Sequence, residues 1–204
     1  MRLVISCMDR RLNHFLRENY SDSIVVRNAG ANMLSLSKTL EKYKNMIDEV
    51  IVLPHTDCGA MKVVFSSIKE GKKITSIVED KLVNQFRDKA FNTLSELERL
   101  NLEVQTENAK KIFVNKPIKS EIIDINKIKI PASNQPYSIY VTTPTTPLDL
   151  SSSTYVVSAE TNDIWDSLDI AIYVMKINNV IVKDDKVAEK IKSIYPSVNV
   201  IKPS

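Results

Sequence analysis

Residues that often carry chemistry are scarce in this sequence of 204 residues, which contains two cysteines, two histidines and three glycines. Cys7 and Cys58 are 51 positions apart, so they form no Cys-x-x-Cys redox motif. No stretch approaches the roughly 18 consecutive apolar residues of a transmembrane helix, and MRLVIS at the start is too short for a signal peptide. We therefore expect a cytoplasmic protein without a membrane partner, whose cysteines are ligands, nucleophiles or core residues rather than a disulfide.

A strong net charge is also absent. The net charge is +3 and no basic run is interleaved with aromatic residues, so we expect no nucleic-acid partner. Hydrophobic residues make up 43% of the chain, which is enough for a packed core. The length predicts one domain, or one domain with a small appendage.

Short apolar runs that alternate with amphipathic segments predict the fold. Strands are expected at 2–6, 23–27, 49–53 and 120–125, and helices at 12–20, 33–46, 63–71, 76–100 and around 105–114. Gly71 is expected to cap the end of the third helix. Because strands that alternate with helices form βαβ units, we predict an α/β fold with a mainly parallel β-sheet flanked by helices.

Three loops that follow predicted strands contain the reactive or geometrically special residues. They are CMDRR (7–11), RNAGA (27–31) and PHTDCGA (54–60). In an open parallel sheet such loops gather at the carboxyl ends of the strands, where ligands bind. Cys7 and Asp9 lie on the first loop, and His55 and Cys58 lie on the third. Thiolate, imidazole and carboxylate are the ligands that zinc prefers in tetrahedral sites, so we predict a Zn²⁺ site here.

Each of these residues also has an ordinary structural explanation. Cys7 alone would be a small core residue, and His55 alone would be a hydrogen-bonded structural histidine. We expect His14, which lies within a predicted helix, to be structural or at the surface. The zinc prediction depends on the combination, because the two loops use both cysteines of the chain.

The same loops resemble a known family. CMDRR resembles the Cys-x-Asp-x-Arg motif of the β-class carbonic anhydrases, HTDC at 55–58 their His-x-x-Cys motif, and RNAG at 27–30 the segment between the two. SEIIDIN near residue 120 resembles the family's last core strand. The resemblance covers residues 1–130 as a zinc domain, and the form with methionine after the cysteine is most similar to the small archaeal-type members.

The resemblance implies a reaction and roles for the residues. Cys7, His55 and Cys58 would bind zinc, and Asp9 would either take the fourth zinc position or turn to Arg11. In the second arrangement, a bidentate pair between Asp9 and Arg11 leaves the fourth position to water, and zinc makes hydroxide available at neutral pH to attack carbon dioxide and form bicarbonate. Asp9 and Arg11 are thus the expected catalytic residues.

Neighbouring loop residues are expected to have lesser roles. The resemblance places Asn28 and Gly30 beside the metal, where they would shape the loop without taking part in the chemistry. Arg10 matches no functional position of the family, so we expect a solvated side chain.

Residues 131–204 lie beyond the resemblance and are expected to form a C-terminal βα extension. They look like a degenerate second copy of the first half: 138–149 resembles 2–13, 153–162 resembles 22–32, and 167–185 parallels 39–57. In this register Thr143, Thr145 and Pro147 stand for Cys7, Asp9 and Arg11, and Asp185 and Ala188 stand for His55 and Cys58. Such a copy would lack every zinc ligand.

A second explanation of this likeness stays open, because unrelated βαβ units share one hydrophobic pattern. The family builds its site at a dimer interface, which implies a homodimer or a higher oligomer. If the extension is a fused copy, the implied assembly is an intramolecular pseudo-dimer with one active site per chain.

Alternative functions also stay open. The same zinc hydroxide would attack other linear molecules, such as carbonyl sulfide or carbon disulfide. A non-catalytic zinc-binding homologue is a third interpretation, although a purely structural site needs no Asp9–Arg11 pair. Redox or nucleophilic cysteine chemistry is the weakest, because it leaves Asp9 and Arg11 unexplained.

Overall fold

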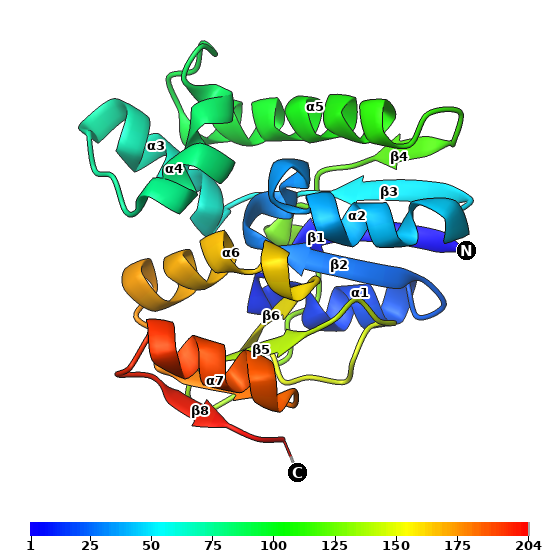
Figure 1. Cartoon of the computed structure of the whole chain (residues 1–204). Helices are drawn as coiled ribbons and strands as arrows, with labels where there is room; N and C mark the ends of the chain where they lie inside the picture. The colour runs from blue at the N-terminus through cyan, green and yellow to red at the C-terminus, as the bar shows by residue number, and fades with distance from the viewer. Residues whose placement is uncertain (204) are drawn as a thin grey trace.

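The computed structural model describes residues 1–203, which surround an eight-stranded β-sheet (Figure 1). The strand order is β4-β3-β1-β2-β6-β5-β7-β8. The strands are β1 (Arg2–Cys7), β2 (Ile24–Asn28), β3 (Glu49–Leu53), β4 (Ile118–Ser120), β5 (Ser138–Thr142), β6 (Thr154–Ser158), β7 (Asn179–Val182) and β8 (Asn199–Ile201). All neighbours are parallel except β2 and β6, which pair antiparallel. This arrangement confirms the predicted α/β class with a mainly parallel sheet.

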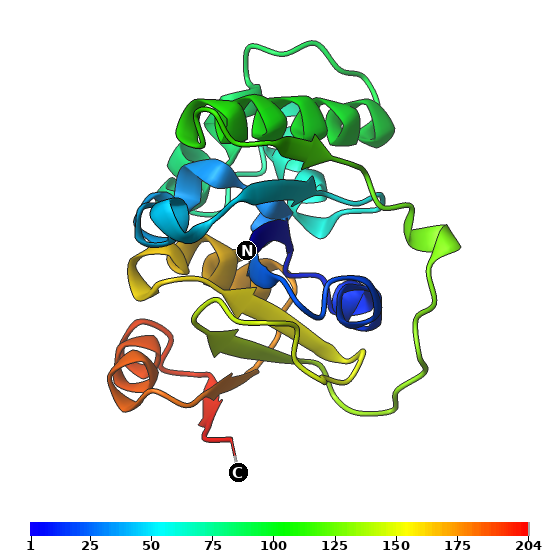
Figure 2. The ribbon, with the colours of Figure 1, turned by 90° about the vertical axis from the view of Figure 1, so that its right-hand side faces the viewer.

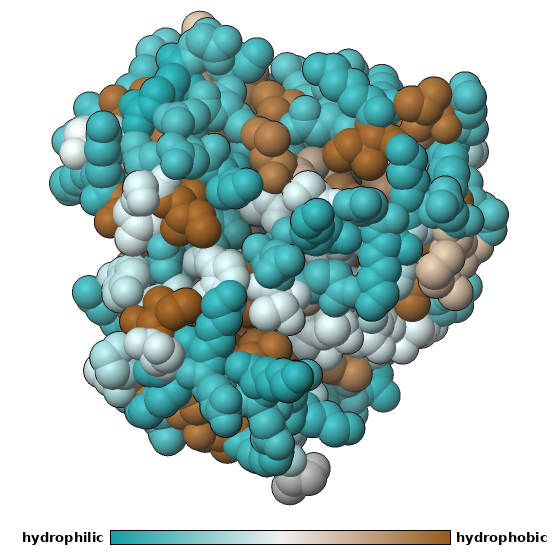
Figure 3. All heavy atoms as spheres, viewed as in Figure 1, coloured by the Kyte–Doolittle hydropathy of each residue, from teal (hydrophilic) through white to brown (hydrophobic). Residues whose placement is uncertain are grey.

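Helices cover both faces of the sheet. They are α1 (Asn13–Asn19), α2 (Ser37–Tyr43), α3 (Gly59–Glu70), α4 (Ser76–Lys81), α5 (Leu94–Ile112), α6 (Trp165–Asp169) and α7 (Asp185–Ile194). Figure 2 separates the faces: α1 lies on one side together with the segment that leads from β4 to β5, and α2, α6 and α7 lie on the other. No helix among residues 1–203 is both long and apolar enough to cross a lipid bilayer. Figure 3 shows a mostly hydrophilic face with apolar side chains in small separate groups.

Local signals explain where the helices begin and end. Helix α3 begins at Gly59, four residues before the predicted start, and Gly71 caps its end with φ 68°, as predicted. The long helix expected at 76–100 is instead divided, because the side chains of Thr75 and Thr93 accept hydrogen bonds from backbone N–H groups and start α4 and α5 separately. Hydrophobic periodicity alone does not reveal these capping threonines.

The fourth strand is expected at 120–125 and is observed at Ile118–Ser120. The apolar residues that suggest the longer strand are buried elsewhere. Ile123 donates its N–H to the carbonyl of Pro54 and accepts a hydrogen bond from the N–H of Thr56. The segment after β4 therefore runs beside the loop that follows β3 and holds it in place.

Two four-stranded parallel units meet at the β2–β6 pair. We call residues 1–130 the N-terminal half and residues 131–203 the C-terminal half. The N-terminal half contributes β4-β3-β1-β2 and the C-terminal half β6-β5-β7-β8, so the two form one continuous sheet. The division into two domains at this boundary stays a prediction.

One part of the register proposed for the C-terminal half is wrong. The sequence register matches Ala188 to Cys58, yet Cys58 is the N-cap of α3, whereas Ala188 lies inside α7 and the N-cap of α7 is Asp184. The cause is a shorter connection: residues 54–58 join β3 to α3, and only residues 183–184 join β7 to α7. The second unit therefore lacks the loop itself, in addition to the ligands.

Candidate metal centre

The first loop of the centre begins where β1 ends. Cys7 is the last residue of β1, and Asp9 is the N-cap of the short 3-10 turn Arg10–Leu12. The Asp9 carboxylate accepts a hydrogen bond from the N–H of Arg11, which fixes the carboxylate at the start of this turn. The sequence thus places thiol and carboxylate two residues apart on one rigid bend.

The second loop follows β3, the neighbour of β1 in the sheet. It carries His55 and ends at Cys58, the N-cap of α3. Between them Asp57 has φ 53°, a left-handed conformation that turns the chain back toward the centre. Because β1 and β3 pair in parallel, the two loops meet at the same edge of the sheet, as predicted.

The structure brings Cys7, His55 and Cys58 together, with their ligand atoms all within 4.8 Å of one another and all three side chains buried. His55 Nδ1 lies 2.7 Å from the carbonyl oxygen of Thr56 and therefore donates its hydrogen to it. This contact leaves a lone pair on Nε2, which is buried without a hydrogen-bond partner. A buried, orphaned nitrogen beside two thiols fits a metal ion.

The two thiols form a tightly coupled pair. A hydrogen bond from Cys58 holds the pKa of Cys7 well below its usual range, and the same contact together with burial raises the pKa of Cys58. One thiolate is thus already favoured within the protein. Thiolate is the form that binds metal, so the donor set suits a soft or borderline cation such as zinc.

Asp9 lies beside the three-residue group and is bound to Arg11. Arg11 Nη2 donates to Asp9 Oδ2 at 2.7 Å and Nε lies 3.1 and 3.2 Å from the two carboxylate oxygens. Burial raises the pKa of Asp9, but the hydrogen bonds from Arg11 outweigh it, so the net pKa is below the usual value. Oδ2 is 3.6 Å from His55 Nε2. The carboxylate therefore stays ionised beside the three metal-binding side chains. The role of Asp9 as a metal ligand stays a prediction.

Arg11 also joins the two loops, which the sequence does not reveal. Its Nη1 donates to the carboxylate of Asp57 and its Nη2 to the carbonyl of Asp57, both at 2.9 Å. Lys62 pairs with the other oxygen of Asp57 at 2.7 Å. Asp57 stands within the HTDC motif, but only the fold shows that it faces Arg11.

Arg27 holds the backbone of the first loop through hydrogen bonds, a role that the sequence did not predict. Its side chain is buried and donates to the carbonyl oxygens of Cys7 and Asp9 and to the side chain of Asn13. Burial lowers the pKa of Arg27 to about 10, so the guanidinium remains charged at neutral pH. The RNAG segment marks this loop, yet the motif alone assigns no role to its first residue.

Two other residues hold the second loop and the segment between the loops. Glu98 on α5 accepts a hydrogen bond from the N–H of Cys58 at 2.8 Å. Asn28 binds the backbone N–H and carbonyl of Asn32 through its side chain, and Gly30 has φ 79°. Asn28 and Gly30 thus shape the loop. Glu98 lies 40 positions from Cys58, and no motif in the sequence indicates that the two are in contact.

The expectation of a solvated Arg10 is wrong. Arg10 Nη1 donates to the carbonyl of Ser152 at 3.0 Å, and its guanidinium carbon lies 4.4 Å from the centre of the Tyr137 ring. Both partners belong to the C-terminal half, which the sequence could not place. His14, by contrast, is half-buried on α1 and is outside the metal group, as expected.

The chain is similar to known proteins over part of its length. A family model described as carbonic anhydrase matches residues 2–134. Among solved structures, the chain is similar to a carbonic anhydrase from Glaciozyma antarctica (21% identity, 63% of this chain and 79% of that chain covered, TM-score 0.40) and to the β-carbonic anhydrase CcaA (19%, 65% and 78%, 0.47). It is also similar to one of two tetrameric β-carbonic anhydrases from Sordaria macrospora (16%, 61% and 76%, 0.45). A search of curated proteins found no match. Because each TM-score is below 0.5, the family assignment depends on the family model.

Proposed function

The chain belongs to the carbonic anhydrase family, and from this premise we propose that it catalyses the reversible hydration of carbon dioxide to bicarbonate. Members of this family are lyases, and the cofactor of the β class is zinc. The observation that carries the proposal is the combination of a buried Cys7–His55–Cys58 group with an ionised Asp9 held beside it by Arg11. A structural zinc site has four protein ligands, and this one presents three together with a carboxylate bound elsewhere.

The chain's own residues define how the reaction would proceed. Zinc bound to Cys7, His55 and Cys58 would supply a Lewis acid that lowers the pKa of a water molecule toward about 7. Asp9 remains an acceptor at neutral pH, because Arg11 keeps it ionised, and its Oδ2 can orient the hydrogen of the attacking water. Arg11 in turn is fixed by Asp57, so the carboxylate is positioned before the substrate arrives.

The test is stopped-flow carbon dioxide hydration with metal content measured on the same sample, for the native protein, Asp9→Ala and Asp9→Asn. We expect one zinc per chain and rapid hydration in the native protein. Asp9→Ala should keep its zinc and lose most of its activity, and Asp9→Asn should recover little, because the amide lacks the negative charge. Zinc without hydration in the native protein would remove this function and direct the assay to carbonyl sulfide and carbon disulfide, or to a non-catalytic role.

The location and assembly belong to the same proposal. A cytoplasmic location suits the free thiols of Cys7 and Cys58, which a reducing compartment preserves. For the assembly, we favour the intramolecular pseudo-dimer over a homodimer. The reason is that β6 of the C-terminal half already pairs with the edge of β2.

A further inference from the structure

The strand order of the sheet is the same read from either edge. Each half places its first strand between its second and third strands, with the fourth strand outermost: β4-β3-β1-β2 and then β6-β5-β7-β8. The single antiparallel pair lies at the centre, between β2 and β6. A twofold axis between two copies of one unit produces this arrangement, since it reverses the strand direction at the junction.

The register places this axis on a particular pair of residues. The β1–β3 ladder begins at Arg2 and the β5–β7 ladder at Ser138, so Leu3 corresponds to Ile139. Leu3 pairs with Ile24, and Ile139 pairs with Tyr155. Three residues further along each strand, Arg27 therefore corresponds to Ser158. Arg27 and Ser158 are the two residues that pair across the junction, and a residue that meets its own equivalent is the mark of a twofold contact.

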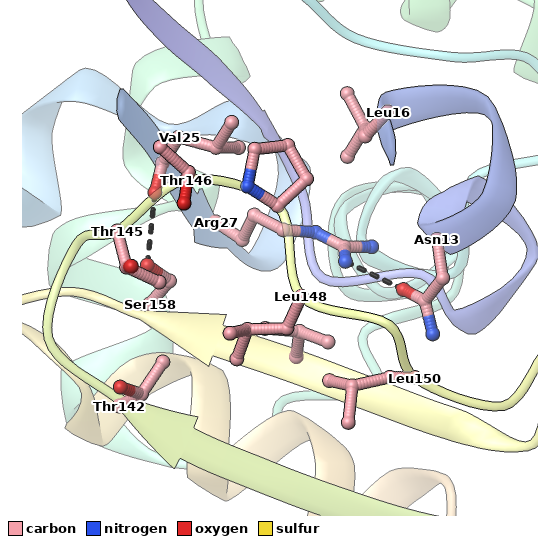
Figure 4. A pocket seen from close by; sticks show the side chains of 12 residues that line it. Asn13, Leu16, Val25, Arg27, Thr142, Thr145, Thr146, Leu148, Leu150 and Ser158 are labelled. Carbon is pink, nitrogen blue, oxygen red and sulfur yellow. Dashed lines mark hydrogen bonds between the residues drawn. The ribbon is translucent and has the colours of Figure 1, made fainter. Parts of the chain in front are cut away.

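Contacts on both sides of this pair repeat each other. Val25, which follows Ile24, donates its N–H to the carbonyl of Thr145 at 2.9 Å; its equivalent Val156 donates to the carbonyl of Met8 at 3.0 Å. Thr145 and Met8 both lie on the loop after the first strand of their half, one position apart in the register. Figure 4 shows this junction, where Val25, Arg27 and Ser158 line one cavity together with Thr145 and Leu148 of the 142–150 loop. The cavity there, of about 20 Å³, has room for about one water molecule, so the halves are closely packed.

We propose that the C-terminal half is a metal-free second copy that takes the place of a partner subunit within the same chain and positions the zinc-binding loop through Arg10. This inference rests on the zinc centre of the proposed function, though not on carbon dioxide hydration itself. The edge of β2, which a second chain would need for the same contact, is already occupied by β6. Residues 1–203 thus form a pseudo-dimer with one metal site, without a second chain.

The C-terminal half holds the metal loop, residues 7–11, at Met8 and at Arg10. Met8, between Cys7 and Asp9, accepts a hydrogen bond from Val156. Arg10 binds the carbonyl of Ser152 and stacks on Tyr137. Tyr137 packs edge-on against Tyr155, with ring centres 5.9 Å apart. Arg10 lies next to Asp9 in sequence, so a displaced Arg10 moves the carboxylate and the Cys7 end of β1. Arg10 is therefore a positioning residue and Tyr137 is its partner.

A double-mutant cycle tests this contact in the full-length, zinc-loaded protein. The variants are Arg10→Ala, Tyr137→Ala and the double variant, with zinc affinity measured by competition with a chromogenic chelator. Tyr137 is 48% exposed, so its truncation should leave the fold intact. We expect each single variant to weaken zinc binding by about tenfold, the lower end of the effect of changes to the residues that orient metal ligands. The double variant should be no weaker than Arg10→Ala, because both changes remove one contact. The absorption bands of the cobalt-substituted protein should shift in the same three variants.

The matched control is Arg17→Ala. Arg17 is an arginine on α1 that also bridges to the C-terminal half, through Asp149 at 2.6 Å, but it lies away from the metal loop. Its zinc affinity and cobalt spectrum should equal those of the native protein. Arg10→Lys should recover only part of the affinity, because lysine lacks the planar group that stacks on the ring. Arg10→Ala and Arg17→Ala with equal zinc affinities would overturn the positioning role.

Native mass spectrometry tests the assembly. We expect one chain of 23.1 kDa with one zinc ion over the micromolar range. A dimer whose dissociation on dilution releases zinc would overturn the pseudo-dimer. The two proposals can fail separately. If the native protein hydrates carbon dioxide and Arg10→Ala binds zinc normally, only the positioning role is wrong. If the native protein binds zinc and the double-mutant cycle is as expected but no hydration occurs, only the proposed function is wrong.

Discussion

The two halves of the molecule have the same strand connections but differ in the loops that leave the strands. In the N-terminal half, residues 54–58 join β3 to α3 and carry two of the three clustered metal-binding side chains. In the C-terminal half, residues 183–184 join β7 to α7 and carry none. Backbone pairing and buried apolar residues maintain the sheet, and neither depends on the loops. A unit of this fold can therefore lose its site and still serve as a packing partner.

The first connection differs in a similar way. Residues 10–19 after β1 form a 3-10 turn and α1, whereas no helix lies between β5 and β6. The 142–150 loop instead lies against Arg27 and Val25 of the N-terminal half. In the C-terminal half, the segment that replaces the helix is thus a contact surface for the N-terminal half.

The largest expected difference between the halves is at the helix N-caps that follow β3 and β7. Cys58→Ser removes a metal ligand, so zinc content should fall below one per chain and carbon dioxide hydration should fall to the uncatalysed background. Asp184→Ala removes the cap of α7, where Asp184 binds the N–H groups of Lys186 and Val187. It should lower the free energy of unfolding by about 1 kcal/mol and leave zinc unchanged. Metal analysis and urea unfolding measure both; loss of zinc from Asp184→Ala would contradict the comparison.

The next effect concerns the pair at the junction. Arg27→Met takes the arginine's hydrogen bonds from the buried carbonyl of Cys7 and the side-chain oxygen of Asn13, and leaves the carbonyl of Asp9 with the N–H of Leu12 alone. The free energy of unfolding should therefore fall by about 3–5 kcal/mol. Ser158→Ala removes one hydrogen bond to the carbonyl of Val25 and should cost about 1 kcal/mol. Urea unfolding of the zinc-loaded proteins gives both values. Equal losses of unfolding free energy in the two variants would show that the stability of the junction does not depend on Arg27.

A pH-dependent effect of about 3 kcal/mol is expected at Asp166, on the face of α6 toward the N-terminal half. Burial raises its pKa to about 6, and one carboxylate oxygen has no partner. The folded pKa is above the unfolded value, so the native protein loses stability as pH rises through about 6 and regains it below. Asp166→Asn should be more stable by about 3 kcal/mol at pH 8, from about two pH units at 1.36 kcal/mol each, and should show no gain near pH 4. Thermal unfolding across this range measures it; a gain independent of pH would contradict the burial argument.

The smallest expected effect is a difference in stability between variants at the C-terminal ends of α3 and α7. Gly71 has φ 68° with open space where a Cβ atom would lie, so Gly71→Ala should cost about 1 kcal/mol from the backbone conformation alone. Helix α7 ends before Tyr195, whose φ is −120°, and requires no glycine. Ser193→Ala in its exposed last turn should change stability by less than about 0.5 kcal/mol. Chemical unfolding compares the two, and a neutral Gly71→Ala would disprove the strain at this cap.

The metal group is predictable because its residues are rare and follow strands. Two cysteines and one of two histidines stand on loops after adjacent parallel strands, and adjacency brings the loops together whatever the details of the helices. Arg27, Asp57 and Glu98 are not predictable as supports. Arginine, aspartate and glutamate are common, and the metal-loop residues that they hold lie 18 to 46 positions away along the chain.

By itself, the sequence determined the α/β class, the three edge loops, the cluster of Cys7, His55 and Cys58 and the ion pair of Asp9 with Arg11. The class and the edge loops follow from the hydrophobic period, which acts locally along the chain. The cluster follows from rare residues placed after adjacent strands, and the ion pair was implied by the family resemblance. Only the tertiary structure decided that β6 pairs with β2, that the connection after β7 is too short to carry ligands and that Arg10 is held by Tyr137 and Ser152. Such contacts join residues more than 120 positions apart, and their energy comes from burial and complementary shape that exist only after the chain has folded.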